Sequence, residues 1–205
     1  MEINRMLGIT ESYKAPKTIM DILYDHEKRE KIFLEFLKVY SNDVSYDWFH
    51  EYFENEHSDR KEKKQDFTPN SVSDILTKVV DTKEGTVYDV ASGTGGIIIR
   101  KWWDECSKST PFSYRPSEHL YCCEELSDRA IPFLLFNLMI RGMNAIVLHC
   151  DILSRECKGI FFVNNAKDDL LSFSSLNLMP YTKNVEDYFE VKFTNFRYPS
   201  ITEVS

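Results

Sequence analysis

The chain has 205 residues and a formal net charge of −8. No apolar stretch approaches the roughly 18–20 residues needed to cross a bilayer, so we expect no membrane contact. The length suits one domain with a helical extension, or two small domains. The acidity disfavours a stand-alone DNA binder, because affinity for DNA comes largely from neutralising phosphates. The one dense basic run, residues 60–64, reads as a solvated linker in preference to a phosphate contact.

The cysteines and histidines indicate neither a metal site nor a disulfide framework. There are five cysteines, an odd number, and none forms a C-x-x-C pair. The five histidines show no spacing that is typical of metal ligands. We therefore expect no bound metal and a cytoplasmic protein.

The first part of the chain reads as helical. A capping box at residues 18–21 predicts a helix start, and apolar residues then recur at helical spacing up to residue 40. Residues 41–43 break the pattern, and an aromatic stripe at positions 48, 49, 52 and 53 predicts a short helix that faces the core. The polar run 54–64 is the best linker candidate. These features predict an N-terminal helical region over residues 1–60 and an α/β domain over 61–205.

Apolar runs and helical segments alternate in the second part. This alternation is typical of a parallel sheet with right-handed crossovers. The predicted strands are 86–90, 120–123, 145–149 and 159–163, and residues 189–193 could form an edge strand. One helix is predicted to begin near residue 70, and two more cover 97–108 and 127–141. Gly142 is expected to end the last of them. Only about 40 residues follow the fourth strand, while a strand and its crossover together use about 30. The sheet is therefore abbreviated, or its last strands are compressed into the tail.

The sequence VYDVASGTGG at residues 87–96 is the most informative feature. An apolar strand ends at Asp89, a glycine-rich turn follows, and an apolar run then opens a helix. Gly93, Gly95 and Gly96 allow positive φ and close approach of a ligand. The spacing D-x-x-x-G-x-G-G differs from that of dinucleotide binders and suits an adenosine ligand such as S-adenosylmethionine. The alternative is a glycine-rich turn that binds no ligand.

Carboxylates stand at the ends of three successive predicted strands. They are Asp89, the pair Glu124 and Glu125, and Asp151. Ligands of such sheets lie beyond the carboxyl ends of the strands, and three unpaired carboxylates would repel each other unless a ligand or cation shared them. The alternative is that they are solvated acids that cap the following helices.

Four segments of the chain, the glycine turn among them, resemble in this order the adenine-N6 DNA methylases, in particular the modification subunits of type I restriction systems. The family has (Q/E)-F-x-T-P, D-P-x-x-G-T-G-G, an acid that precedes a helix ending in N-L-x-x-x-G, and G-D-x-L. This chain has QDFTP at 65–69, the glycine turn, EELS at 124–127 with FNLMIRG at 136–142, and HCDIL at 149–153. The resemblance covers residues 45–165 and implies a Rossmann-like, S-adenosylmethionine-dependent methyltransferase fold.

The resemblance also implies a role for the residues of this chain that match the family's motifs. The turn would bind the methionine part of the cofactor, Glu125 or Glu124 the ribose hydroxyls, and Asp151 the adenine amino group. Counting back from Asn137 favours Glu125, whereas counting from the strand favours Glu124. The implied cofactor-binding set is Phe67, Thr68, Asp89, Ala91, Gly93, Gly95, Glu124, Glu125, Asp151 and Ile152.

The expected catalytic loop departs from the family. In the family N-P-P-(F/Y) follows the fourth strand, and its aromatic ring stacks on a base flipped out of the duplex. Here residues 164–167 read NNAK, so both prolines and the aromatic are replaced. Asn164 and Asn165 are the remaining catalytic candidates. This loop predicts weak or absent catalysis by the chain alone.

Two functions follow from these observations. The first is an S-adenosylmethionine-dependent adenine-N6 DNA methyltransferase, impaired or dependent on a specificity subunit or another protein partner. The second is a non-catalytic methylase-fold protein that binds a protein partner, as a restriction–modification accessory, an anti-restriction protein or a regulator. The acidity of the chain, its altered loop and its short C-terminal part favour the second function. The glycine turn and the aligned acids favour cofactor binding under both functions.

Overall fold

The computed structural model describes residues 2–56, 85–110 and 113–203. The predicted boundary at residue 60, the helix predicted near residue 70, and the candidate residues Phe67 and Thr68 lie outside these ranges. Within the described part, no helix combines the length and the apolar character that crossing a membrane requires. In the same ranges, no group of three histidine, cysteine or acidic side chains has the arrangement of a metal site.

Within residues 2–56, four helices form the N-terminal region: α1 (Glu2–Met6), α2 (Ala15–Leu23), α3 (His26–Val39) and α4 (His50–Glu56), with a 3-10 turn at Ser12–Lys14. The predicted helix start at residue 18 is wrong, since α2 begins at Ala15 with Pro16 in its first turn, where a missing N–H costs nothing. Asp25 instead caps α3, accepting the backbone N–H of Lys28 at 3.2 Å. The break predicted at 41–43 is confirmed, because Ser41 and Asn42 have positive φ.

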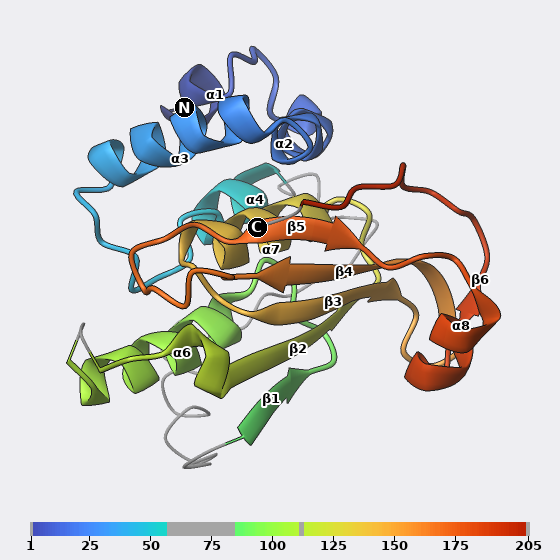
Figure 1. Cartoon of the computed structure of the whole chain (residues 1–205). Coiled ribbons are helices and arrows are strands. Elements are labelled where there is room, and N and C mark those ends of the chain that lie inside the picture. Colours follow the sequence, from blue (N-terminus) through green and yellow to red (C-terminus); the bar gives the residue numbers. More distant parts are fainter. Residues whose placement is uncertain (1, 57–84, 111–112, 204–205) are drawn as a thin grey trace.

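The sheet has six strands: β1 (Gly85–Asp89), β2 (His119–Glu125), β3 (Ala145–Cys150), β4 (Glu156–Asn164), β5 (Ser175–Leu178) and β6 (Lys192–Phe193). The order is β1-β2-β3-β4-β5, with β6 beside β4 (Figure 1). Strands β1, β2 and β3 run parallel, as predicted, but β4 is antiparallel to β3 and β5 is antiparallel to β4. The prediction of a parallel fourth strand is therefore wrong, because β3 and β4 form a hairpin in which Asp151 N–H donates to Glu156 O at 2.9 Å.

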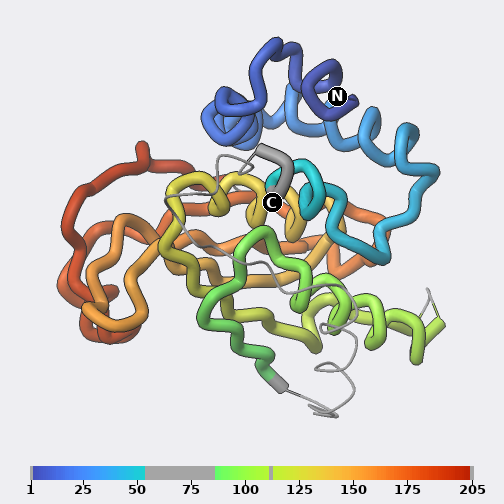
Figure 2. Tube along the Cα trace, turned by 180° about the vertical axis from the view of Figure 1, so that it is seen from behind, coloured from blue at the N-terminus to red at the C-terminus, as the bar shows by residue number. Residues whose placement is uncertain are grey.

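Two helices, α6 (Gly96–Lys108) and α7 (Ala130–Ile140), cover one face of the sheet; they lie in front of it in the reverse view (Figure 2). Every residue of α7 is buried. A helix that is apolar all round must be covered on all sides, and here the sheet lies on one side and α2 on the other. Gly142 ends α7 with φ +63°, which confirms the predicted C-terminal glycine.

One hydrophobic core joins the N-terminal helices to the sheet. The ring of Phe136 on α7 lies 4.7 Å from that of Phe33 and 5.1 Å from that of Phe49, both contributed by the N-terminal region. Trp48, Phe49 and Phe53 are buried, so the prediction that the aromatic stripe faces the core is confirmed. The described N-terminal helices therefore fold as one structural unit with the sheet.

The opposite face of the sheet is covered only in part by the described residues. There α8 (Lys183–Phe189) packs against a second, smaller apolar cluster that includes Leu148 and Ile160, and β6, paired beside β4, contributes Phe193 to this cluster. The edge strand predicted at 189–193 is reduced to Lys192–Phe193, because α8 extends to Phe189 and Glu190 turns the chain with φ +53°.

Candidate functional site

The glycine turn joins the end of β1 to the start of α6. Gly93 has φ +56° and Gly95 has φ +99°, so the positive φ predicted for these two glycines is confirmed, whereas that prediction is wrong for Gly96, which is the first residue of the helix. A Cβ atom at Gly95 would lie 3.0 Å from Cδ1 of Leu134. The turn therefore favours glycine at both positions for its backbone conformation, and at Gly95 also for its packing against α7.

Asp89 ends β1 immediately before this turn. Its Oδ1 accepts the backbone N–H of Ala91 at 3.3 Å, and its Oδ2 is buried without a hydrogen-bond partner among the described residues. Burial raises the pKa of this carboxyl, and the bond from Ala91 opposes the rise. A buried acceptor without a donor is costly, so Oδ2 is a natural place for a ligand that carries N–H donors.

The structure separates the two neighbouring glutamates at the end of β2. Glu125 faces the glycine turn: Oε2 accepts the backbone N–H of Gly93 at 2.7 Å, and Oε1 accepts that of Ser127 at 2.7 Å. Glu124 points to the opposite face of the sheet, where it accepts hydrogen bonds from Tyr88, Cys150 and Arg155. Glu125 is therefore the residue of the pair that lies beside Asp89 and the turn.

Asp151 follows β3 at the same edge of the sheet as Asp89 and Glu125, since the three strands are parallel. Its Oδ1 accepts the backbone N–H groups of Leu153 at 2.8 Å and of Ser154 at 3.4 Å, and these bonds lower its pKa. Ile152 is 38% exposed beside it. In this structure the carboxylate thus holds its own hairpin turn.

Asn164 and Asn165 lie at the opposite edge of the sheet, because β4 runs antiparallel to β3. The N–H of Asn165 donates to Oδ1 of Asn144, the residue before β3, at 2.6 Å. Its buried side-chain amide donates to Gly142 O at 2.9 Å and to Asp169 O at 2.8 Å. The structure does not bring these two candidates to the glycine turn, and Asn165 holds a loop against the end of α7.

A buried polar network next to the turn contains residues that the sequence analysis did not single out. It consists of Asp47, Thr94 and Arg141, together with Asn137, which was used only to count positions. Thr94 lies between the two left-handed glycines, and its hydroxyl donates to Asp47. The sequence does indicate part of this network at 136–142, because Asn137 and Arg141 are polar residues one helical turn apart in an otherwise apolar helix. No local pattern marks Asp47.

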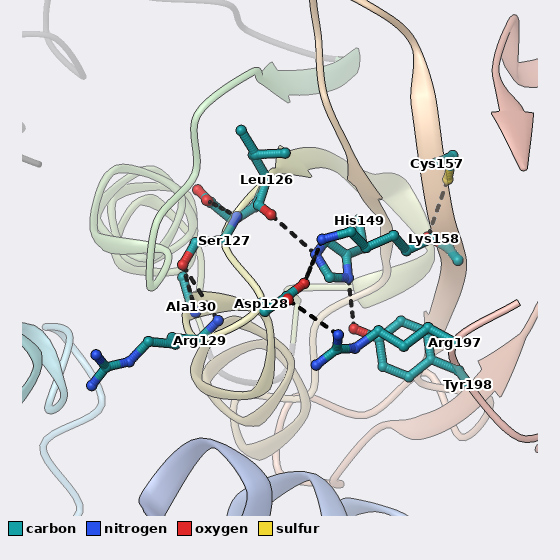
Figure 3. A network of polar contacts seen from close by, with 12 residues as sticks. Leu126, Ser127, Asp128, Arg129, Ala130, His149, Cys157, Lys158, Arg197 and Tyr198 are labelled. Carbon is teal, nitrogen blue, oxygen red and sulfur yellow. Dashed lines mark hydrogen bonds and ion pairs between the residues drawn. The ribbon is translucent and has the colours of Figure 1, made fainter. Parts of the chain in front are cut away.

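A second network lies at the loop between β2 and α7 (Figure 3). His149 is fully buried, with Nδ1 2.6 Å from the hydroxyl of Tyr198 and Nε2 3.1 Å from Leu126 O. Nε2 is also 3.0 Å from Asp128, which pairs in addition with Lys158 and Arg197. The network joins the C-terminal segment to the carboxyl edge of β3.

Burial lowers the pKa of His149 to about 4, and the neighbouring Lys158 adds to the shift while Asp128 opposes it. Between the ordinary value near 6.5 and about 4, the unfolded chain binds the proton and the folded chain does not, so stability falls as the pH is lowered through this window. This difference in the pKa of His149 between the unfolded and the folded chain corresponds to about 3 kcal/mol in the free energy of unfolding.

We expect urea unfolding from pH 7.5 to 4.5 to show this loss, and the His149→Gln variant to lose distinctly less stability over the same range. Parallel pH dependence in both proteins would exclude His149 as the source.

One of the comparisons with known proteins identifies a family for this chain. A family model for N-6 DNA methylases matches residues 42–165, well over half of the chain. The matched range begins before Asp47 and includes the turn, Glu125 and Asp151. No curated protein and no solved structure matches. The chain belongs to the N-6 DNA methylase family.

Proposed function

We propose that the chain binds S-adenosylmethionine at residues 91–96 and is a DNA adenine-N6 methyltransferase-like protein. The observation that carries this proposal is the convergence of three features at one edge of the sheet. They are the Oδ2 of Asp89, which has no hydrogen-bond partner among the described residues, the left-handed Gly93 and Gly95, and the carboxylate of Glu125. Membership of the N-6 DNA methylase family supports the same assignment.

The residues present fit this cofactor. The Oδ2 of Asp89 accepts no hydrogen bond within the described part of the chain and is suited to the ammonium group of the methionine part, and the glycines leave the backbone open to close approach. Each oxygen of Glu125 accepts one backbone bond and keeps a further lone pair for a ribose hydroxyl. Asp151 and Ile152 would bind the adenine, with the carboxylate released from its hairpin turn. When bound, the cofactor supplies a methyl group on a sulfonium.

We further propose that methyl transfer depends on a partner. The two catalytic candidates, Asn164 and Asn165, are at the far edge of the sheet from the turn, and Asn165 is committed to structural hydrogen bonds. The partner would be a specificity subunit or another protein that presents the DNA. The same separation favours the alternative function, a non-catalytic protein that keeps the cofactor site and acts on a protein partner.

Calorimetry with S-adenosylmethionine tests the proposed site. We expect Glu125→Gln to weaken binding by about 1–3 kcal/mol, as for the loss of a hydrogen bond to a charged group. Glu124→Gln is the matched control, since Glu124 faces away from the turn, and its affinity should equal that of the wild type. Gly93→Val should abolish binding, because valine does not tolerate positive φ.

Equal affinity in the wild type and in Glu125→Gln would refute the ribose assignment. Absence of binding to the wild-type protein would refute the cofactor proposal. A tritiated-methyl assay on mixed DNA separates the two functions: we expect little or no transfer by the chain alone, and robust transfer would remove the need for a partner.

A further inference from the structure

The loop between α3 and α4 reaches the glycine turn through one buried carboxylate. Asp47 is 6% exposed, and its Oδ1 accepts the backbone N–H of Phe49 at 2.9 Å and Nδ2 of Asn137 at 2.8 Å. Its Oδ2 accepts the hydroxyl of Thr94. Asn137 Nδ2 also donates to the backbone carbonyl of Thr94 at 2.8 Å. Both the side chain and the backbone of Thr94 are therefore held from outside the turn.

Arg141 fixes the other end of the network. Its Nη1 donates to Oδ1 of Asn137 at 2.8 Å, which orients the amide of Asn137 towards Asp47 and Thr94. Its Nε and Nη2 donate to the carbonyls of Val44 at 2.9 Å and of Tyr46 at 2.6 Å, so the guanidinium is hydrogen-bonded to the loop on both sides of Ser45.

The buried charges of this network compensate each other. Burial lowers the pKa of Arg141 to about 10, and Asp47 opposes that shift, so Arg141 stays protonated at neutral pH. The guanidinium also lies 4.9 Å from the ring of Trp48. A buried carboxylate that is satisfied by several donors and faced by a cation holds one geometry firmly.

The glycine turn is thus fastened on two sides. Glu125 holds Gly93 from β2, and Asp47 holds Thr94 from the N-terminal region. Two of the three residues from 93 to 95 are glycines in the left-handed region, so the backbone here has more alternative conformations than a segment without glycine. External bonds are what select one of them.

We propose that Asp47 is a positioning residue, by which the N-terminal helical region sets the conformation of the cofactor turn and thereby the affinity for S-adenosylmethionine. This inference rests on the proposed cofactor site. Asp47 acts through Thr94 and Asn137, and the preorganised turn spares the ligand the cost of ordering it.

The hydroxyl of Thr94 gives the cleanest test. Thr94→Val keeps the shape and removes the donor to Asp47, and we expect about a tenfold loss of affinity, the equivalent of one hydrogen bond. Amide hydrogen exchange at residues 93–95 should become faster in the same variant. Thr94→Ser keeps the donor and should restore both affinity and protection. A general loss of stability would not distinguish valine from serine in this way.

A double-variant cycle ties the effect to Asp47. Asp47→Ala and Thr94→Val break the same bond, so the double variant should lose less affinity than the two single losses combined. Asp43→Ala is the matched control, because Asp43 is an exposed acid of the same loop whose Oδ1 accepts hydrogen bonds from Ser45, outside the glycine turn. If Asp47→Ala does not fold, the valine and serine variants at position 94 still decide the matter.

The two proposals fail in different ways. If the wild-type protein does not bind S-adenosylmethionine, the cofactor site is wrong, and the proposal of a positioning residue for it falls as well, whatever the amide exchange shows. If the wild type binds, but Thr94→Val matches Thr94→Ser in affinity and in exchange, the cofactor site stands and the role of Asp47 is overturned.

Discussion

Replacing Gly142 with alanine is expected to destabilise the protein by about 3 kcal/mol. The residue has φ +63°, which costs an L-residue about 1–2 kcal/mol. A Cβ atom there would also lie 2.4 Å from the carbonyl oxygen of Ser172 and 2.8 Å from Nδ2 of Asn165. Since both neighbours belong to the loop that Asn165 holds in place, neither can withdraw cheaply, and the overlap adds a further cost of about 1–3 kcal/mol.

The free energy of unfolding in urea measures this effect, and Gly8→Ala is its matched control. Gly8 has φ +66°, but a Cβ atom there would meet no heavy atom within 4 Å. The control should therefore lose only the backbone contribution of about 1–2 kcal/mol. Equal losses in the two variants would show that the loop over Gly142 yields, and that its contact with the end of α7 is not rigid.

Removing the guanidinium of Arg155 should have an effect of similar or larger size. Glu124 is 2% exposed, and the guanidinium of Arg155 pairs with it, with Nη1 2.7 Å from Oε2 of Glu124. Taking one partner from a buried ion pair leaves an uncompensated charge and costs about 3–5 kcal/mol. Arg155 is itself 30% exposed, so we expect a value at the lower end. Arg155→Ala also removes the donors to the carbonyls of Phe189 and Glu190 at the end of α8.

The double variant Arg155→Ala with Glu124→Gln identifies the cause. Because it carries no buried charge, it should recover part of the stability that Arg155→Ala loses. Lys17→Ala serves as the control for an ordinary ion pair: Lys17 and Asp21 are 83% and 64% exposed, and such pairs contribute less than about 1 kcal/mol. If Arg155→Ala lost no more stability than Lys17→Ala, the burial of Glu124 would not require the guanidinium.

Features that depend on the local chain were predictable from the sequence. The unit of β1, glycine turn and α6 was one of them, since an apolar strand, a glycine-rich turn and a second apolar run in this order are typical of a strand–turn–helix unit. The ending of α7 at Gly142 was another. The contrast between Glu124 and Glu125 was also implicit, since neighbours on a strand point to opposite faces, but which of them faces the turn depends on which face α6 and α7 cover.

The direction of β4 is decided by the length of its connection to β3. An apolar strand reads the same in both directions, but a parallel crossover needs a dozen or more residues. The predicted strands 145–149 and 159–163 leave only nine residues between them, and the observed hairpin uses Asp151 to Arg155. That short connection places Asn164 and Asn165 at the far edge of the sheet and separates them from the cofactor turn.

The sequence by itself therefore determined the family, the glycine turn and the acids that end three parallel strands, because short-range patterning and backbone conformation encode them. Only the tertiary structure decided that Glu125 faces the turn, that Asn165 is structural, and that Asp47 reaches Thr94. Asp47 and Thr94 are 47 positions apart in the sequence, and Asp47 and Asn137 are 90 apart. Such contacts form because packing of α7 between the sheet and the N-terminal helices brings their elements together.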